Sequence, residues 1–185
     1  METQLNNPIE KFGLAEDEKA VQMMFYVASG IFWGTVTTKK VVRLSTWLRG
    51  VSAPDNVRIL NAKGLITTAG GQPKPNAFLE TNIPTQFIDA YHILPPAQES
   101  VDYDESEPNR KMIPVTLAIG TFLCRCQLRI ASVQTLDKFL DVTHEEFISA
   151  YNAEIFCPVM PSLGTLKTSL LQVRRGNTIS SISLD

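Results

Sequence analysis

The residues with the most chemical potential in this chain are its cysteines and histidines. Cys124 and Cys126 flank an arginine, and alternate residues of a strand share one face, so both thiols are expected to point the same way. A structural zinc site takes about four ligands, usually in paired spacings. Only Cys157 and His144 lie near enough in sequence to complete one. Buried structural cysteines are therefore the favoured interpretation, with metal binding and redox chemistry as alternatives.

The other patterns that indicate catalysis are missing from the sequence. The two histidines, His92 and His144, lie far apart, and there is no Gly-x-Ser-x-Gly elbow, phosphate loop or Gly-x-Gly-x-x-Gly run. Asp141, Glu145 and Glu146 are more typical of helix-start charge or a solvated face than of paired catalytic carboxylates. We therefore expect a protein that is not an enzyme and that needs no cofactor and no metal.

Composition favours a soluble globular protein. The chain has 185 residues, of which 44% are hydrophobic and 19% charged, enough apolar material for a core. The net charge is −2 without a block of Lys and Arg, which argues against nucleic acid as the partner. The first residues lack the pattern of a signal peptide, and no apolar run reaches the ~18 residues of a membrane span. A cytoplasmic location with reduced thiols follows, with no membrane partner.

One stretch of the sequence has a second version later in the chain. It begins with an apolar run around a glycine, continues with a short segment centred on an aromatic residue, and ends in a strand-like stretch with an Asn-Ala step. The first version is Tyr26 to Ile66, with Gly30, Trp47 and Asn61-Ala62, and the second begins at Val115, with Gly120, Phe139 and Asn152-Ala153.

This repetition predicts the fold class and the domain boundaries. We expect a mainly β protein of two tandem, pseudo-repeated small β-barrel or sandwich modules, each with one short helical turn. Glycines inside the strands would supply the bends that close a small barrel. The expected parts are a leader over 1–24, a first module over 25–96, an acidic linker over 97–111 and a second module over 112–185.

Local patterns predict the individual elements. The leader is expected to hold a short helix over Leu14 to Met24, with an early start of the first strand as the alternative. The stretch 143–153 carries a helical capping box but aligns with a strand in the first copy, so a strand is favoured. The remaining expectations are a strand Tyr26–Thr38, Ser45 as N-cap, a hairpin loop Thr67–Asn82, a strand Thr85–Leu94 and a bent strand Val115–Ile130.

A short phrase adds a family resemblance. Arg43-Leu44-Ser45-Thr46-Trp47-Leu48, followed by Val57 to Ala62, resembles a group of uncharacterised bacterial proteins with an Arg-Leu-Ser-Asp-Tyr-Leu-type turn. In the second copy Thr135 stands in place of the arginine. The resemblance implies a small Sm-like or SH3-like β-barrel present as a tandem repeat, and it implies no particular chemistry.

The function that the sequence favours is a structural or interaction role. Duplicated small β-modules have spare strand edges and apolar faces, which suit a homo-oligomer or docking on a protein partner. The aromatic side chains Trp33, Phe78 and Tyr91 are the contact candidates, whereas Trp47 is expected in the core.

Two alternative functions are open. The first alternative is a regulatory module that holds a small ligand between its two copies. The second alternative is Sm-like RNA binding. Arg125, Arg129, Arg174 and Arg175 would form one basic patch for RNA or another anion if the first and last strands of the second module were neighbours.

Overall fold

The computed structural model describes residues 13–50, 53–66 and 75–182, and the chain is mainly β. The front half of the chain, residues 13–93, begins with a strand hairpin, passes through a short 3-10 helix and ends in the strand that meets the back half. Its elements are β1 (Glu18–Val27), β2 (Gly30–Lys39), η1 (Leu44–Arg49), β3 (Asn56–Ile66), β4 (Pro75–Pro84), η2 (Thr85–Phe87) and β5 (Ala90–Ile93).

The back half, residues 110–182, has five strands, as the front half does, with an α-helix between its second and third strands and two 3-10 turns later in the chain. Its elements are β6 (Arg110–Ile119), β7 (Phe122–Ala131), α2 (Leu136–Val142), β8 (Phe147–Phe156), η3 (Pro161–Leu163), β9 (Leu166–Arg174), η4 (Arg175–Asn177) and β10 (Thr178–Ser181).

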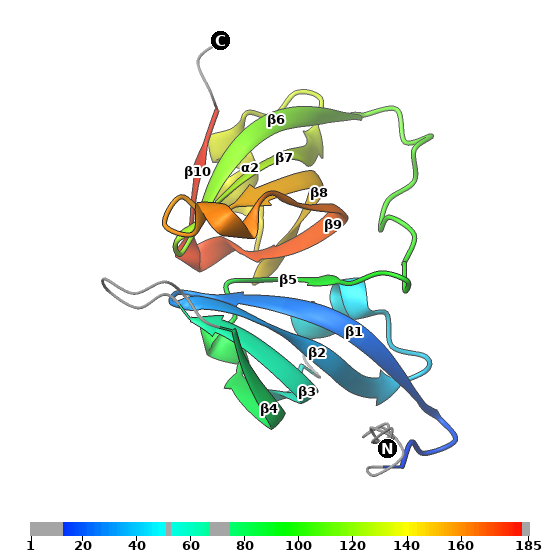
Figure 1. The fold of residues 1–185 in the computed structure, drawn as a ribbon. Helices are drawn as coiled ribbons and strands as arrows, with labels where there is room; N and C mark the ends of the chain where they lie inside the picture. Colours follow the sequence, from blue (N-terminus) through cyan, green and yellow to red (C-terminus); the bar gives the residue numbers. More distant parts are fainter. Residues whose placement is uncertain (1–12, 51–52, 67–74, 183–185) are drawn as a thin grey trace, which may run out of the picture.

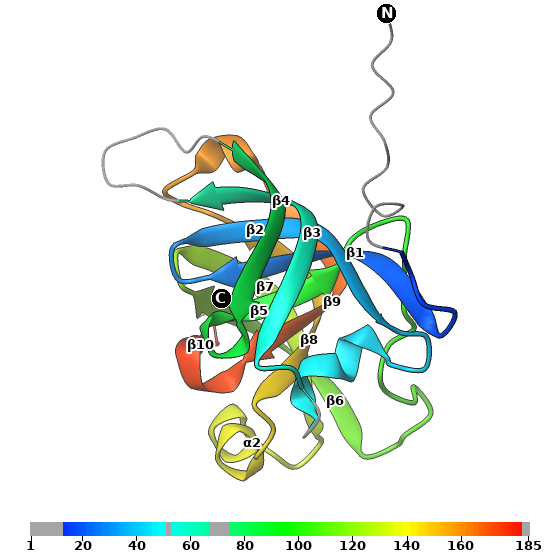
Figure 2. The same ribbon diagram turned by 90° about the horizontal axis from the view of Figure 1, so that it is seen from below.

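The ten strands of the described residues belong to one antiparallel sheet. Their order is β10-β6-β7-β8-β9-β5-β1-β2-β3-β4, so the two halves occupy separate stretches of the sheet and meet where β5 pairs with β9. In Figure 1 the front half lies below this meeting point and the back half above it. Figure 2 shows η1 and α2 on the same side of the molecule.

Strand β1 contributes side chains to two hydrophobic cores. Met23, Phe25 and Val27 lie in the front core, which is built mainly from residues of the front half, while Met24 and Tyr26 lie in the back core, which is built mainly from residues of the back half. The expected helix over Leu14 to Met24 is therefore wrong. The helix-favouring Ala, Gln and Met residues are outweighed by burial on both faces of a strand, because tertiary packing overrides weak local propensity.

Each half opens with a tight hairpin where the sequence predicts one bent strand. Val27 pairs with Gly30 around the turn between β1 and β2, and Ile119 pairs with Phe122 around the turn between β6 and β7. Gly120 has a φ of 55°, the left-handed conformation that glycine adopts readily. The expected single strands Tyr26–Thr38 and Val115–Ile130 are thus wrong, because the chain turns back at Ala28-Ser29 and at Gly120-Thr121 instead of bending.

The same irregularity recurs in both halves. The pairing of β2 with β3 shifts between Trp33 and Thr35, and the pairing of β7 with β8 shifts between Arg125 and Gln127. Opposite these shifts, Asn61 and Asn152 have φ values of 48° and 51°. Asparagine tolerates this conformation better than most residues. The expected strand over 143–153 is confirmed from Phe147 onward, and the Asn-Ala steps mark bulges.

Each half has its short helix, but the expected cap is wrong. The N-cap of η1 is Arg43, not Ser45, and no side chain on this helix caps it. Instead the Glu99 carboxylate accepts hydrogen bonds from the backbone N–H groups of Leu44 (2.8 Å) and Ser45 (2.9 Å). Free N–H groups at a helix start need such partners, and here the linker supplies them.

Three further boundaries differ from the expectation. Residues 75–82 of the expected hairpin loop belong to β4, and residues 67–74 lie outside the described residues. The expected strand over Thr85–Leu94 is a 3-10 turn followed by the four-residue β5, because β5 pairs only where β1 and β9 flank it. The acidic linker ends by Arg110, where β6 begins.

Within the described part of the chain, no helix has the length and apolar character that crossing a membrane requires.

Candidate functional site

The feature that organises the molecule is the junction between its halves. Strands β5 and β9 pair over Ala90 opposite Val173 and Tyr91 opposite Gln172. Next to this ladder the N–H of Arg174 donates to the carbonyl of Asp89 at 2.7 Å. The two halves are thus joined by main-chain hydrogen bonds between two strand edges, the arrangement by which separate sheets associate.

Side chains from each half complete the core of the other. Phe147, at the start of β8, lies in the front core and meets Tyr91 edge to face at 5.2 Å. In the opposite direction Tyr26 enters the back core and meets Phe122 edge to face at 5.1 Å. Burial raises the pKa of both tyrosines above the usual value. Because neither core is complete alone, the halves are expected to unfold together.

Arg174 clamps the junction from the end of β9. Its side chain donates to the backbone carbonyls of Ile88 (2.7 Å) and Thr85, pairs with Glu146, and lies 4.5 Å over the Phe147 ring. The residue is only 6% exposed. Burial lowers the pKa of this guanidinium, which keeps its charge at any ordinary pH. A charged side chain is thereby used to fix the loop before β5.

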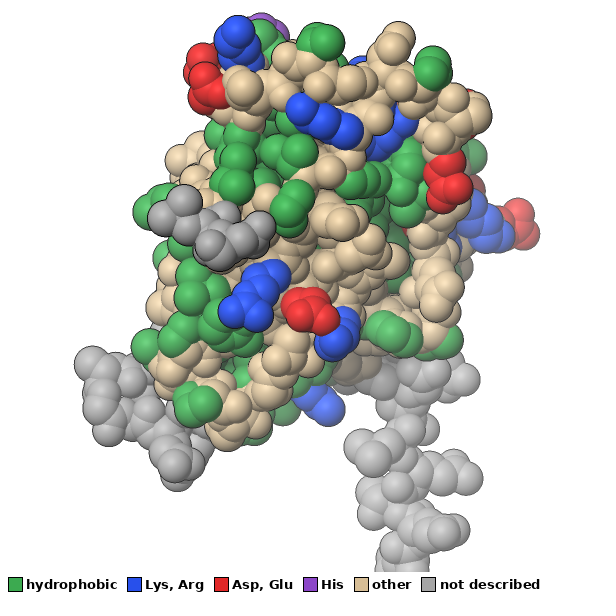
Figure 3. All heavy atoms as spheres, turned by 90° about the horizontal axis from the view of Figure 1, so that it is seen from above, with side chains coloured by type: hydrophobic (Ala, Val, Ile, Leu, Met, Phe, Trp, Pro, Cys, Tyr) green, Lys and Arg blue, Asp and Glu red, His purple; other side chains and the backbone are tan. Residues whose placement is uncertain are grey.

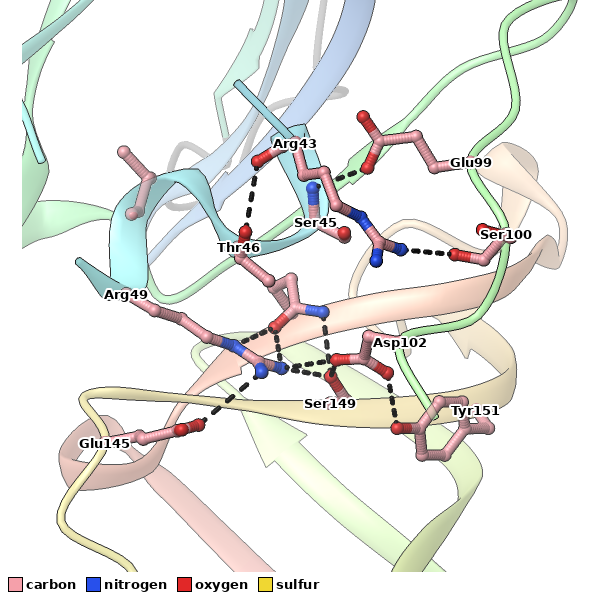
Figure 4. Close-up of polar contacts among 12 residues, drawn as sticks. Arg43, Ser45, Thr46, Arg49, Glu99, Ser100, Asp102, Glu145, Ser149 and Tyr151 are labelled. Atoms are coloured by element: carbon pink, nitrogen blue, oxygen red, sulfur yellow. Dashed lines mark hydrogen bonds and ion pairs between the residues drawn. The ribbon is translucent and has the colours of Figure 1, made fainter. Parts of the chain in front are cut away.

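A second arginine bridges the halves through a polar network, which Figure 4 shows. Arg49, at the end of η1, donates from Nε to Gln172 Oε1 at 2.9 Å and also to the Ser149 hydroxyl. The same guanidinium lies 3.2 Å from Asp102 and 3.5 Å from Glu145. The front-half helix is therefore tied to β8 and β9 of the back half.

The acidic linker is part of this network and does not act as a free hinge. Asp102, whose side chain is 9% exposed, accepts hydrogen bonds from Ser149 and Tyr151, each at 2.6 Å. Burial alone would raise the pKa of Asp102, but these hydrogen bonds and Arg49 outweigh it and lower the pKa. The composition that marks this segment as an acidic linker does not show which of its acidic residues find buried partners.

A cavity of about 360 Å³ opens beside the junction. Its walls come from η1, β5, the linker and β9. His92 in its wall is neutral at pH 7, because burial lowers its pKa to about 4. The buried Ser45 hydroxyl lies near the Glu99 carboxylate but makes no hydrogen bond of standard geometry within the described residues. A cavity lined by such a group could hold a small polar molecule.

The sheet also ends in two edges. Among the described residues, β4 pairs only with β3, and β10 pairs only with β6. Each edge carries exposed apolar side chains. On β4 these are Phe78 (38% exposed) and Leu79, and on β10 it is Ile179 (72% exposed). Edge strands of this kind present main-chain donors and acceptors to another strand.

The three aromatic contact candidates lie in different environments. Trp33 on β2 is half-buried against the back core. Tyr91 is 1% exposed and packs inside the junction, so it contacts the other half of its own chain. Phe78 lies on the edge strand β4 and not in a loop, and it is the candidate that the structure leaves accessible.

The four arginines do not gather into one patch. Arg125 and Arg129 lie on β7, and β8 separates them from Arg174 on β9. Arg129 pairs with Glu107 at 2.6 Å and lies over Tyr103, Arg174 is buried in the junction, and Arg175 donates to the carbonyl of Leu140. On the face in Figure 3, basic side chains are scattered among hydrophobic and acidic ones.

The cysteines are structural side chains of the back core. Cys124, Cys126 and Cys157 are all buried, and the first two lie on one strand with both thiols in the same core cluster. The hydrogen bond with Cys126, together with burial, raises the pKa of Cys124, which disfavours a reactive thiolate. The described residues contain no group of three or more metal-ligating side chains.

The residues that build the junction were largely missed by sequence reasoning. Arg49, Asp102, Ser149 and Gln172 lie in four separate segments, and no local spacing connects them. Phe147 carries only a general signal, since aromatic residues are enriched in strands. For the polar residues the sequence holds no comparable signal.

Comparisons of the chain with protein-family models, with curated proteins and with solved structures found no match.

Proposed function

We propose that this protein is a non-enzymatic structural protein that associates with other copies of itself through the edges of its sheet. In this proposal the two halves are tandem copies of one small β-barrel-like module, of the Sm-like or SH3-like kind. The observation that carries it is the β5·β9 junction, where one half already pairs its strand edge with the other while, among the described residues, an outer edge of each half has no strand beside it.

The recurring irregularities support the repeat. Asn61 and Asn152 occupy the same left-handed conformation opposite the same break in strand pairing. A short helix precedes the third strand in each half, and a 3-10 turn precedes the last one. A one-residue shift in the pairing of two strands would turn every side chain of a strand to the other face of the sheet. Agreement of the pairing register between the halves is therefore stronger support for a repeat than an equal number of strands.

Light scattering during size-exclusion chromatography tests the proposed function. The measured mass should rise with loading concentration above the 20.5 kDa of one chain. A constant monomer mass up to hundreds of micromolar would contradict self-association. Oligomers that persist at all dilutions would favour it, as would oligomers that dissociate on dilution.

A second candidate function is the binding of a small regulatory ligand between the two halves. The cavity beside the junction favours it, because Ser45 offers a buried hydroxyl without a well-formed hydrogen bond. Native mass spectrometry of the purified protein should then find a bound small molecule, and Ser45→Leu should abolish it. Identical intact masses under native and denaturing conditions, even after incubation with a metabolite extract, would contradict this candidate.

Sm-like RNA binding is the third candidate and has the least support. The arginines that would carry it are divided between β7 and the buried junction, as described above. A filter-binding titration with single-stranded RNA at low salt would test it, with micromolar or tighter binding as the supporting result.

A further inference from the structure

We infer that the partner of each open edge is a second copy of this chain, and that β10 of one copy pairs antiparallel with β4 of the next. The inferred register places Ile179 opposite Ile83 and Ser180 opposite Asn82. This inference depends on the proposed repeat and self-association, and it adds the polarity and the register of the contact.

The place of β4 in its half matches the place of β9. Val57 lies four residues before the left-handed Asn61 and pairs with Ile83. Ile148 lies four residues before Asn152 and pairs with Val173. Ile83 therefore corresponds to Val173, and by the next pair along each strand Asn82 corresponds to Gln172.

The place of β10 matches the place of β5 by the same reasoning. Tyr26 lies one residue before Val27, the last paired residue of β1 before the turn, and it pairs with Ala90 on β5. Ala118 lies one residue before Ile119, the last paired residue of β6 before the turn, and it pairs with Ile179 on β10. Ile179 therefore corresponds to Ala90, and Ser180 corresponds to Tyr91.

The internal junction then fixes the external register. Inside the chain Ala90 lies opposite Val173, and Tyr91 lies opposite Gln172. Replacing each residue by its counterpart puts Ile179 opposite Ile83 and Ser180 opposite Asn82. Ala90 lies in the back core within the chain, so Ile179, now 72% exposed, would cover the front core of the neighbouring copy.

The contact joins two different edges, so it is heterologous. A chain of such contacts closes into a ring or continues as a filament, depending on the rotation between copies. The outer contact lacks four features of the internal junction. Pro84 replaces Arg174, so both the side-chain clamp and the main-chain N–H that donates to Asp89 are missing. Asn56 replaces Phe147, and Ser180 replaces Tyr91. We therefore expect an association that reverses on dilution.

Site-directed cross-linking tests the register. Residues directly opposite on antiparallel strands have Cβ atoms about 4.5–5.5 Å apart, close enough for a disulfide after a small adjustment. Two variants, N82C and S180C, should each stay uncross-linked alone and form a covalent dimer when mixed under mild oxidation. The three native cysteines are buried, so the protein without added cysteines should form no covalent dimer and provides the background of the experiment. The pair N82C with S181C is the matched control, because Ser181 lies on the other face of β10.

The outcomes separate this inference from the proposed function. Light-scattering oligomers without the N82C–S180C dimer would overturn the register and leave self-association standing. An N82C homodimer would indicate symmetric β4–β4 pairing and would overturn the polarity. A monomer at every concentration would overturn both.

Discussion

The internal junction and the two outer edges differ in their side chains more than in their backbones. At the junction, the main-chain ladder between β5 and β9 is reinforced by a buried arginine clamp, an aromatic contact and a polar network. At the edges, β4 and β10 offer a ladder and exposed apolar residues alone. Strand pairing gives geometry, whereas buried side chains determine whether a contact is permanent.

The largest effect is expected from removing the aromatic contact at the junction. Phe147→Ala should lower the free energy of unfolding by about 3–5 kcal/mol, because it leaves a cavity in a fully packed core. The control Phe87→Ala, at a residue 58% exposed, should stay within about 0.5 kcal/mol of the original protein. Urea denaturation followed by circular dichroism measures both. Equal effects of the two changes would contradict the shared core.

Removal of the clamp should have the next largest effect. Arg174→Ala leaves the carbonyls of Thr85 and Ile88 without their donors and should cost about 2–3 kcal/mol of unfolding free energy. Arg125→Ala, at an exposed arginine, is the matched control and should change it by less than about 0.5 kcal/mol. If the two variants had the same midpoint of urea unfolding, the Arg174 side chain would contribute nothing to the free energy of unfolding.

How much of this architecture the sequence predicts depends on whether the signal is local. The Asn-Ala steps at Asn61 and Asn152 both fall at a left-handed residue opposite a shift in strand pairing, and the preference for strand after Thr143 is confirmed by β8. The helix expected before Met24 is wrong, because two cores bury opposite faces of β1. No local pattern could show that.

The candidate site was less predictable than the fold. Arg174 was selected as a basic surface residue, but it is a buried clamp, because its neighbours come from η2 and β8. Arg49 and Asp102 were not selected at all, since their contact spans the linker and both halves. Single-sequence reasoning finds turns and alternation, whereas long-range polar contacts need the strand order.

The polar network should make stability depend on pH. The pKa of Asp102 is lower in the folded protein than the ~3.9 of an unfolded aspartate, so its contribution is present above about pH 4 and is lost as the pH falls through the lower folded value. Asp102→Asn should cost about 1–2 kcal/mol at pH 7, and this difference should shrink below pH 4. Asp55→Asn is the exposed control. A difference that is independent of pH would mean that the Asp102 charge does not matter.

The smallest effect on stability, but a clear one on assembly, is expected at the outer edge. Ile179→Lys places a charge on β10 and should weaken the association constant about tenfold, with unfolding free energy unchanged within about 0.5 kcal/mol. Val133→Lys, at a residue 93% exposed and outside both edges, adds the same charge as a control. Light scattering over a concentration series measures the association. Equal weakening by both variants would point to net charge and not to the edge.

Amide hydrogen exchange at low and high protein concentration tests the central claim most directly. If the sheet continues from one copy to the next, protection of the β4 and β10 amides should increase with concentration, while the amides of β5 and β9 stay equally protected at both. Protection of β4 and β10 that is the same at every concentration would contradict assembly through these edges.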